Sequence, residues 1–173
     1  MLFKEKNMIN RNVKRIGKEQ AFQKLKHYCG YQERCHQEAK EKLYAFGLYK
    51  QEVEEVISRL IEEDYLNEER FAMAFAGGKF RMKGWGRIKI TEALKEKRVS
   101  DYCIKKAMKE INESSYQATL QKFAESKWAS LKSENNIFIK MSKTQDHLLQ
   151  KGYEPHLVNS ILNNLRSGKH EEG

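Results

Sequence analysis

Two histidines and two cysteines lie close together in the first quarter of the chain, and side chains of these types can bind zinc or form a nucleophilic thiol–imidazole pair. They are His27, Cys29, Cys35 and His36. Structural zinc sites usually contain cysteine pairs two to four residues apart, and these residues offer no such pair. We therefore favour half-buried thiols and solvated imidazoles, and expect no metal and no other cofactor. A zinc or cysteine-dependent enzyme is the alternative, which elemental analysis of the purified protein would test.

A glycine pair and an acidic run are two further patterns that could indicate a nucleotide site and a metal site, respectively. Gly77-Gly78-Lys79 is followed by Phe80 instead of Ser or Thr, and it lacks the earlier glycine of a phosphate-binding loop. We interpret the two glycines as a point of bending or close packing in a long helix. Six carboxylates gather within residues 52–64, and we assign most of them to the solvated face of a helix. No catalytic motif results, so we predict a protein that is not an enzyme. The six carboxylates are Glu52, Glu54, Glu55, Glu62, Glu63 and Asp64.

The strongest candidate for binding is the basic segment 79–89. Five cations lie within these eleven residues, around a tryptophan, Trp85, that has a glycine on each side. Cations contact phosphates and an accessible indole stacks on a base, although the same segment also suits an acidic protein groove. The alternative is a solvated loop whose Trp85 folds back onto the core. We favour binding because the basic surface continues on the following helix. The predicted contact residues are Arg70, Lys79, Arg81, Lys83, Trp85, Arg87, Lys89, Lys95, Lys97 and Arg98. Arg70 has a second interpretation, as an anchor for the acidic helix before it.

The composition favours a helical, basic protein. Among 173 residues there is one proline, a third are charged, and the net charge is +9. The charge is uneven: residues 1–50 carry +7, 51–78 carry −6, 79–109 carry +8, and 110–173 are neutral. No apolar run approaches the roughly 20 residues of a membrane span, and the first residues lack the apolar core of a secretory signal. Three cysteines without framework spacing suit a reducing compartment. We therefore expect a cytoplasmic protein with no membrane association.

A repeated pattern divides the chain into units of about 50 residues. Apolar side chains recur at −4, +1, +6, +10 and +13 from a turn residue, which is Gly47, Arg98 or Gly152. Glycine suits the left-handed position after a helix, and the apolar residues at +1 and +6 suit a hydrophobic staple at the start of the next helix. Such periodicity indicates tandem repeats in which neighbours complete each other's core.

Each unit has the apolar periodicity of three short helices, and no segment has a convincing strand pattern. The sequence therefore predicts an all-α fold of three tandem three-helix repeats stacked into an elongated array. The expected segments are a basic mobile arm (1–16), three repeats (17–63, 64–113 and 114–166) and a tail (167–173).

The central residues resemble a known family. The signature comprises Tyr-Leu-Asn-Glu-Glu-Arg-Phe-Ala at 65–72, then Lys79, Arg81, Lys83, Gly86, Arg87 and Ile88, and Leu-Lys-Glu-Lys at 94–97. It is similar to that of the bacterial RecX proteins, regulators of the recombinase RecA. Leu43 to Gly47, with Val53 and Ile57, resembles the family's first repeat. The likeness spans residues 18 to about 166 and is most specific in the middle.

Two positions depart from the family pattern. Asp64 and Arg98 stand where the family commonly has glycine. A non-glycine residue in the left-handed region costs roughly 1–2 kcal/mol, so we expect the turn at Arg98 to adopt another geometry.

The resemblance implies a curved array that lies in the groove of a RecA–DNA filament. It implies a non-catalytic modulator, mainly an inhibitor, that limits filament growth, ATP hydrolysis and strand exchange in DNA repair, recombination and the SOS response. The expected partners are the RecA filament and single-stranded DNA, with double-stranded DNA left open, and the protein is expected to be a monomer. The alternative is a general DNA- or RNA-binding helical repeat protein without recombinase specificity.

Overall fold

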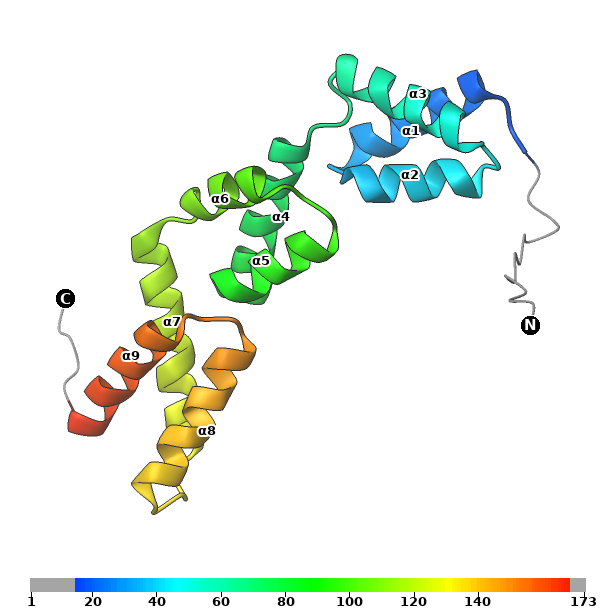
Figure 1. Ribbon diagram of the computed structural model, residues 1–173. Coiled ribbons are helices and arrows are strands. Elements are labelled where there is room, and N and C mark those ends of the chain that lie inside the picture. Colours follow the sequence, from blue (N-terminus) through cyan, green and yellow to red (C-terminus); the bar gives the residue numbers. More distant parts are fainter. Residues whose placement is uncertain (1–14, 169–173) are drawn as a thin grey trace, which may run out of the picture. The chain divides into compact units, whose positions relative to one another are not determined.

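The structure is a computed structural model that describes residues 15–168, and every regular element within that range is an α-helix (Figure 1). The helices are α1 (Lys18–Tyr31), α2 (His36–Ala45), α3 (Lys50–Glu62), α4 (Glu68–Lys83), α5 (Arg87–Glu96), α6 (Asp101–Lys109), α7 (Glu113–Ser130), α8 (Ile137–Gln150) and α9 (Pro155–Ser167). The all-α class predicted from the sequence is confirmed.

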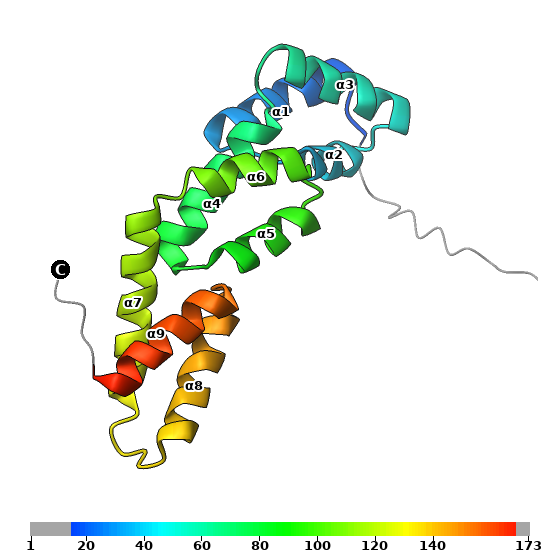
Figure 2. The same ribbon diagram turned by 60° about the vertical axis from the view of Figure 1, so that its left-hand side comes forward.

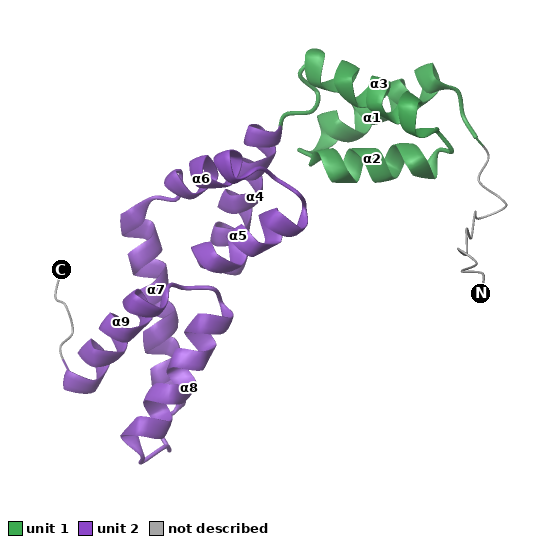
Figure 3. Ribbon diagram, viewed as in Figure 1, with its two compact units in different colours: residues 1–67 green, residues 68–173 purple. Residues whose placement is uncertain are grey.

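The chain divides into two compact units, residues 1–67 (unit 1) and 68–173 (unit 2) (Figure 3). Unit 1 contains the helix triplet α1–α3. Unit 2 contains two triplets, α4–α6 and α7–α9, and both views show the three helices of each triplet together (Figures 1 and 2). The closest helix packing is within the triplets: α4 packs on α6, for example, and α8 on α9.

Unit 1 has its own apolar core. Phe22 and Leu25 of α1, Leu43 of α2, and Val53 and Leu60 of α3 are completely buried. Their spacing within each helix is that of a single apolar stripe, which explains why three short helices suffice to enclose a core. Ile16, which we assigned to a mobile arm, packs against this core, while residues 1–14 of the predicted arm lie outside the described residues.

The turn between the second and third helices has the same geometry in all three triplets. Its central residue has a positive φ: 79° at Gly47, 58° at Arg98 and 91° at Gly152. The amide after the turn donates to the carbonyl five residues earlier, which closes the end of the helix as a Schellman motif does. These bonds are Leu48 N to Leu43 O (3.3 Å), Val99 N to Leu94 O (3.1 Å) and Tyr153 N to Leu148 O (3.3 Å).

The expectation that Arg98 would force another geometry is therefore wrong. Arg98 adopts the left-handed conformation, and so does Asp64 after α3. These two are the only residues other than glycine with a positive φ in the described part of the chain. Burial of the flanking residues explains the outcome, because Leu94 and Val99 are both in the core and an altered turn would expose one of them. Core packing thus outweighs the local strain.

The two triplets of unit 2 are joined through glycines. The Gly86 amide donates to the Lys151 carbonyl at 2.8 Å, and the Ile88 amide donates to the Gly152 carbonyl at 3.0 Å. A Cβ atom on Gly86 would lie 2.2 Å from the Gly152 carbonyl oxygen, so only glycine permits this approach. The Tyr153 hydroxyl also donates to the Gly84 carbonyl at 3.1 Å. The segment 84–86, which lies within the predicted basic binding segment 79–89, is the joint between the triplets.

Candidate partner-binding face of unit 2

Five residues form a continuous set of cation–π contacts: two are on α4, one is in the α4–α5 turn, one is on α5 and one directly follows α5. The Lys79 ammonium lies 5.2 Å from the ring centre of Phe75 and 5.0 Å from that of Trp85. The Lys89 ammonium lies 4.9 Å from the Trp85 ring, and that of Lys97 lies 5.7 Å from the Phe75 ring. We call these five residues the basic–aromatic face. It contains four of the predicted contact residues and Phe75, which was not among them.

Two of the three cations of this face, Lys79 and Lys89, are balanced weakly by their own surroundings. Lys79 and Lys89 form no ion pair with a carboxylate of residues 15–168, and Lys89 donates instead to the Gln150 carbonyl at 3.2 Å. A cation–π contact at an exposed site contributes only about 0.5–1 kcal/mol. Their positive potential is therefore available to an anionic partner.

Lys83 and Lys95 extend the positive charge of this region. Lys83 lies one helical turn beyond Lys79 on α4, and Lys95 lies near the end of α5; both side chains are exposed. Arg98 is exposed at the left-handed turn after α5. All three predicted contact residues are thus accessible.

Arg87 lies in the joint between the two triplets of unit 2. Its guanidinium lies 4.0 Å from the Tyr116 ring centre, 2.7 Å from a carboxylate oxygen of Glu113 and 3.6 Å from one of Glu154. Desolvation opposes the charged form, but Glu113 and Glu154 outweigh it and raise the pKa of Arg87. A charge that already faces two carboxylates has less to offer a partner, and its surroundings indicate a structural role.

Tyr116 completes this joint. Its hydroxyl accepts a hydrogen bond from the Arg87 amide at 2.9 Å and donates to Glu154 at 2.5 Å. Burial, followed by the nearby carboxylate, raises the pKa of Tyr116, so the phenol remains protonated and able to donate. The joint therefore fixes the start of α5 relative to α7 and α9, and with it the turn that carries Trp85.

Arg70 and Arg81 lie on the other side of α4 from Lys79. At roughly 100° per residue, Arg81 is rotated about 200° from Lys79 and Arg70 about 180°. Arg81 borders a shallow cavity together with Glu110 and Ser115, and its guanidinium would contact a Cβ on Gly77. The ten predicted contact residues therefore occupy at least three surroundings instead of one stripe.

The sequence contains a partial signal for the contact between Phe75 and Lys79, which we did not predict. Phe75 and Lys79 are four residues apart on one helix, which is the spacing of neighbouring side chains. By contrast, the joint of Arg87 with Glu113 and Glu154 has no local signal, because those partners are far away along the chain.

The clustered residues His27, Cys29, Cys35 and His36 do not form a metal site. Within residues 15–168 no three His, Cys, Asp or Glu side chains are arranged to hold a metal ion. Cys29, Cys35 and Cys103 are buried. Cys35 caps α2, since its sulfur accepts a hydrogen bond from the Glu38 amide at 3.4 Å. Burial raises the pKa of the Cys103 thiol above its ordinary value, which disfavours the reactive thiolate.

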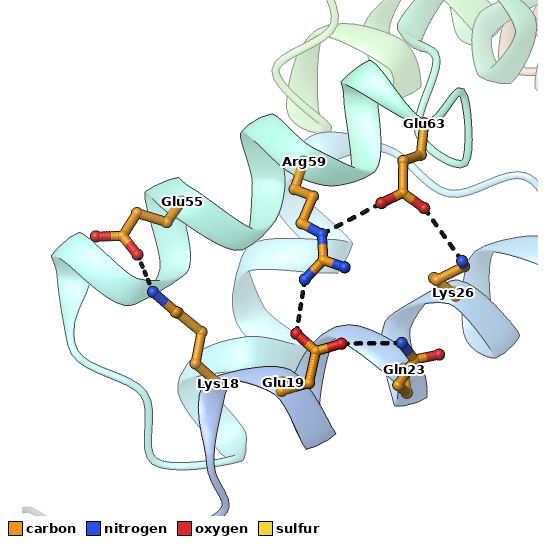
Figure 4. Close-up of polar contacts among 7 residues, drawn as sticks. All are labelled: Lys18, Glu19, Gln23, Lys26, Glu55, Arg59 and Glu63. Atoms are coloured by element: carbon orange, nitrogen blue, oxygen red, sulfur yellow. Dashed lines mark hydrogen bonds and ion pairs between the residues drawn. The ribbon is translucent and has the colours of Figure 1, made fainter.

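The acidic run of α3 faces cations of the N-terminal part of unit 1 (Figure 4). Glu52 pairs with Arg15 at 2.7 Å, Glu55 pairs with Lys18, and Glu63 pairs with Lys26 at 3.1 Å. We call these three pairs the ion-pair ladder. In addition, Arg59 bridges α3 to Glu19 of α1 at 2.7 Å. All of the six carboxylates except Glu52 are exposed, as predicted, and three of the six pair with cations of the first basic block.

None of the helices in the described range is both long and apolar enough to cross a membrane.

The fold and its surfaces define a class: an all-α repeat protein whose second repeat bears a basic–aromatic face. Residues 67–108 match the sequence profile of RecX, second three-helix domain. A regulatory protein RecX of Clostridium perfringens is 32% identical over 136 residues, covering 78% of this chain and 63% of the relative; one from Prosthecochloris aestuarii is 27% identical, covering 80% and 88%. The crystal structure of RecX from Lactobacillus salivarius matches with a TM-score of 0.77 at 21% identity, over 87% of this chain and 97% of that one. By these sequence matches the chain is similar to the RecX family. It spans less than two thirds of the length of the Clostridium perfringens relative.

Proposed function

We propose that this protein is a non-catalytic regulator of the RecA recombinase that binds the RecA–DNA filament and restrains its ATP hydrolysis, growth and strand exchange. Similarity to the RecX family supports the choice of partner. The observation that carries the proposal is the basic–aromatic face, in which Lys79, Lys89 and Lys97 surround the rings of Phe75 and Trp85.

The chemistry of the face suits a filament made of protein and DNA. Lysines contact phosphates or carboxylates, while aromatic rings supply apolar area at a small cost in conformational entropy. A helical repeat also offers several weak contacts at once, and such contacts add when the partner is itself a repeating polymer. Direct contact with DNA, monomeric state and cytoplasmic location belong to the same proposal.

The test is ATP hydrolysis by filaments of a bacterial RecA on single-stranded DNA, with this protein titrated in at two salt concentrations. We expect inhibition at well below one molecule per RecA. The variant Lys79→Ala/Lys97→Ala should raise the half-inhibitory concentration about tenfold, because two charged contacts with the filament of about 0.7 kcal/mol each are lost. The matched control is Lys109→Ala/Lys122→Ala, which removes two exposed helical lysines of unit 2 elsewhere.

Three outcomes decide the proposal. Inhibition that is weakened by the face variant and unchanged by the control supports it. If both variants weakened inhibition equally, inhibition would depend on the overall positive charge of the protein and not on the basic–aromatic face. Salt-sensitive DNA binding without any effect on RecA would refute the regulator and leave a general nucleic-acid-binding repeat protein.

A further inference from the structure

The first two helix triplets can be superposed residue by residue through a shift of 51 in the numbering. Helix α2 begins at His36 and α5 at Arg87; α3 begins at Lys50 and α6 at Asp101. The left-handed turn residues, Gly47 and Arg98, obey the same shift. A side chain of unit 1 therefore has a defined counterpart in unit 2, and the counterpart of the basic–aromatic face can be located in unit 1.

At that location unit 1 carries a second set of cations packed on aromatic rings. The Arg34 guanidinium lies 4.0 Å from the ring centre of Tyr28. The Lys42 ammonium lies 5.6 Å from the Tyr28 ring and 5.7 Å from the Phe46 ring. We call Tyr28, Arg34, Lys42 and Phe46 the α1–α2 cluster.

At three positions the α1–α2 cluster and the basic–aromatic face coincide, but an aromatic residue in one stands where the other has a cation. Tyr28 corresponds to Lys79, Arg34 to Trp85 and Phe46 to Lys97. In each triplet the residue on the first helix and the residue before the second helix contact each other as cation and ring: Arg34 on Tyr28 in unit 1, Lys79 on Trp85 in unit 2. The same chemistry is thus present at the same place in both units, although the individual residues are not alike.

The cations of the α1–α2 cluster lack the carboxylate partners that several other cations of unit 1 have. Lys18, Lys26 and Arg59 each pair with a carboxylate. Arg34 and Lys42 form no ion pair with the carboxylates of residues 15–168, and the Nε atom of Arg34 is buried without a hydrogen-bond partner there. The nearby Glu38 is engaged at the N-terminus of α2, where it accepts from the Cys35 amide at 3.3 Å. Unit 1 therefore pairs one group of its cations with carboxylates, and Arg34 and Lys42 are not in that group.

An exposed ring lies beside the cluster. Tyr31 is 84% exposed and follows Tyr28 by three residues on α1, which places the two side chains on neighbouring parts of the helix surface. An exposed ring next to the cations of the cluster fits a strand with both bases and phosphates, since bases stack on rings while phosphates contact the cations. An acidic protein surface would use the cations and leave the exposed ring without a specific role.

We propose that unit 1 carries a second binding site, the α1–α2 cluster with Tyr31, and that its ligand is single-stranded nucleic acid. The chain then has one basic–aromatic site in each compact unit. This site is defined by direct contact with the strand, so it holds whether or not RecA is the partner of the face in unit 2.

The test uses the full chain and a fluorescein-labelled oligo(dT) of 12 nucleotides, with binding followed by anisotropy at several salt concentrations and no RecA present. Arg34→Ala/Lys42→Ala should weaken binding about fivefold to tenfold and reduce the slope of log affinity against log salt by about 1.4, because two phosphate contacts are lost. Lys18→Ala/Lys50→Ala removes two exposed cations of the same unit that lie beside carboxylates and should have little effect.

A second variant separates binding from folding. Tyr31→Ala alters a ring that is already 84% exposed, so helix content by circular dichroism should stay unchanged. Loss of one stacked base should weaken oligo(dT) binding at least about fivefold, with the salt slope unaltered.

Unchanged affinity in both the Arg34/Lys42 and the Tyr31 variants would overturn the second site. Binding of polyglutamate, an acidic polypeptide, is measured in parallel. If the Arg34→Ala/Lys42→Ala variant kept its affinity for oligo(dT) but no longer bound polyglutamate, the cluster would be a site for an acidic protein surface and the proposal would also be overturned. Because RecA is absent from these measurements, failure here leaves the regulator proposal to its own test.

Discussion

The ion-pair ladder of unit 1 and the basic–aromatic face of unit 2 place their lysines beside different kinds of side chain. In the ion-pair ladder, Lys18 and Lys26 of α1 face Glu55 of α3 and Glu63 directly after it. On the basic–aromatic face, Lys79 and Lys89 instead lie over rings. The first arrangement cancels charge and the second keeps it. Net charge along the sequence therefore does not measure the charge that a partner encounters.

The same contrast exists inside each unit. In unit 2, Arg87 pairs with Glu113 and lies over Tyr116, although it belongs to the same basic segment as Lys79. In unit 1, Arg34 and Lys42 lie on aromatic rings while Lys26 has a carboxylate partner. Each unit thus divides its cations between holding the fold together and facing outward.

The largest expected effect tests whether the two units are separate in stability. Leu43 and Leu94 are repeat equivalents, and both are completely buried. Replacing either with Asp buries an unpaired charge and should cost more than about 3 kcal/mol, enough to unfold its unit. Both tryptophans, Trp85 and Trp128, belong to unit 2, so the units can be followed independently.

Leu94→Asp should therefore abolish the cooperative tryptophan-fluorescence transition on heating. Leu43→Asp should keep that transition while losing about a third of the helical circular dichroism signal, since three of the nine described helices belong to unit 1. Loss of the fluorescence transition in both variants would show that the two units unfold together. That result would contradict the prediction that each unit has a stability of its own.

The second effect concerns the joint that holds the basic–aromatic face in place. Gly86→Ala introduces a Cβ 2.2 Å from the Gly152 carbonyl oxygen, and the backbone shift needed to relieve this clash should destabilise unit 2 by about 3 kcal/mol. Gly78→Ala is the matched control in the same unit. It lies inside α4 with no atom within 4 Å of the added Cβ, and should stabilise the helix by about 1 kcal/mol. Urea unfolding followed by fluorescence measures both changes; equal stabilities would contradict the joint.

A smaller effect isolates strain at the turn after α5. Arg98 has φ of 58°, and Arg98→Gly should remove left-handed strain while loosening the unfolded chain, for a net gain of about 0.5–1 kcal/mol. In the opposite direction, Gly47→Ala should lose stability, because φ there is 79° and the added Cβ would lie 3.1 Å from Arg15. Thermal melts of both variants check the signs. If Arg98→Gly also weakens RecA inhibition, Arg98 contributes to binding at the expense of stability.

The smallest effect is the pH dependence of unit 1. Hydrogen bonds from Arg59 and Lys26, respectively, lower the pKa values of Glu19 and Glu63 below 4.5. Because the folded-state pKa values are lower than the unfolded ones, the stabilisation is present above pH 4.5 and is lost as the pH falls through the folded values. The pairs are exposed, so the effect should be modest and should shrink in 1 M salt.

Glu19→Gln/Glu63→Gln should flatten the acid side of the stability profile, as measured by circular dichroism melts between pH 3 and pH 6. An unchanged profile would mean that these two carboxylates contribute nothing measurable to unit 1.

The sequence by itself determined the local structure and much of the architecture. Apolar periodicity defined the helices, and the spacing around Gly47, Arg98 and Gly152 identified a turn that recurs with the same hydrogen bonds. Ser100 caps α6 and Pro155 begins α9, and both are residue types that favour the start of a helix. These features depend on residues within a few positions of one another, so sequence alone specifies them. The family signature in residues 65–97 is local in the same sense.

The tertiary structure alone decided which charges are neutralised. The ladder joins residues 37 positions apart, and Arg87 meets Glu113 from 26 positions away. It also decided that Arg98 keeps the left-handed turn, because core residues on both sides fix the backbone. A charge or a dihedral angle depends on whatever folding brings next to it, and those neighbours come from other helices whose packing no local pattern records.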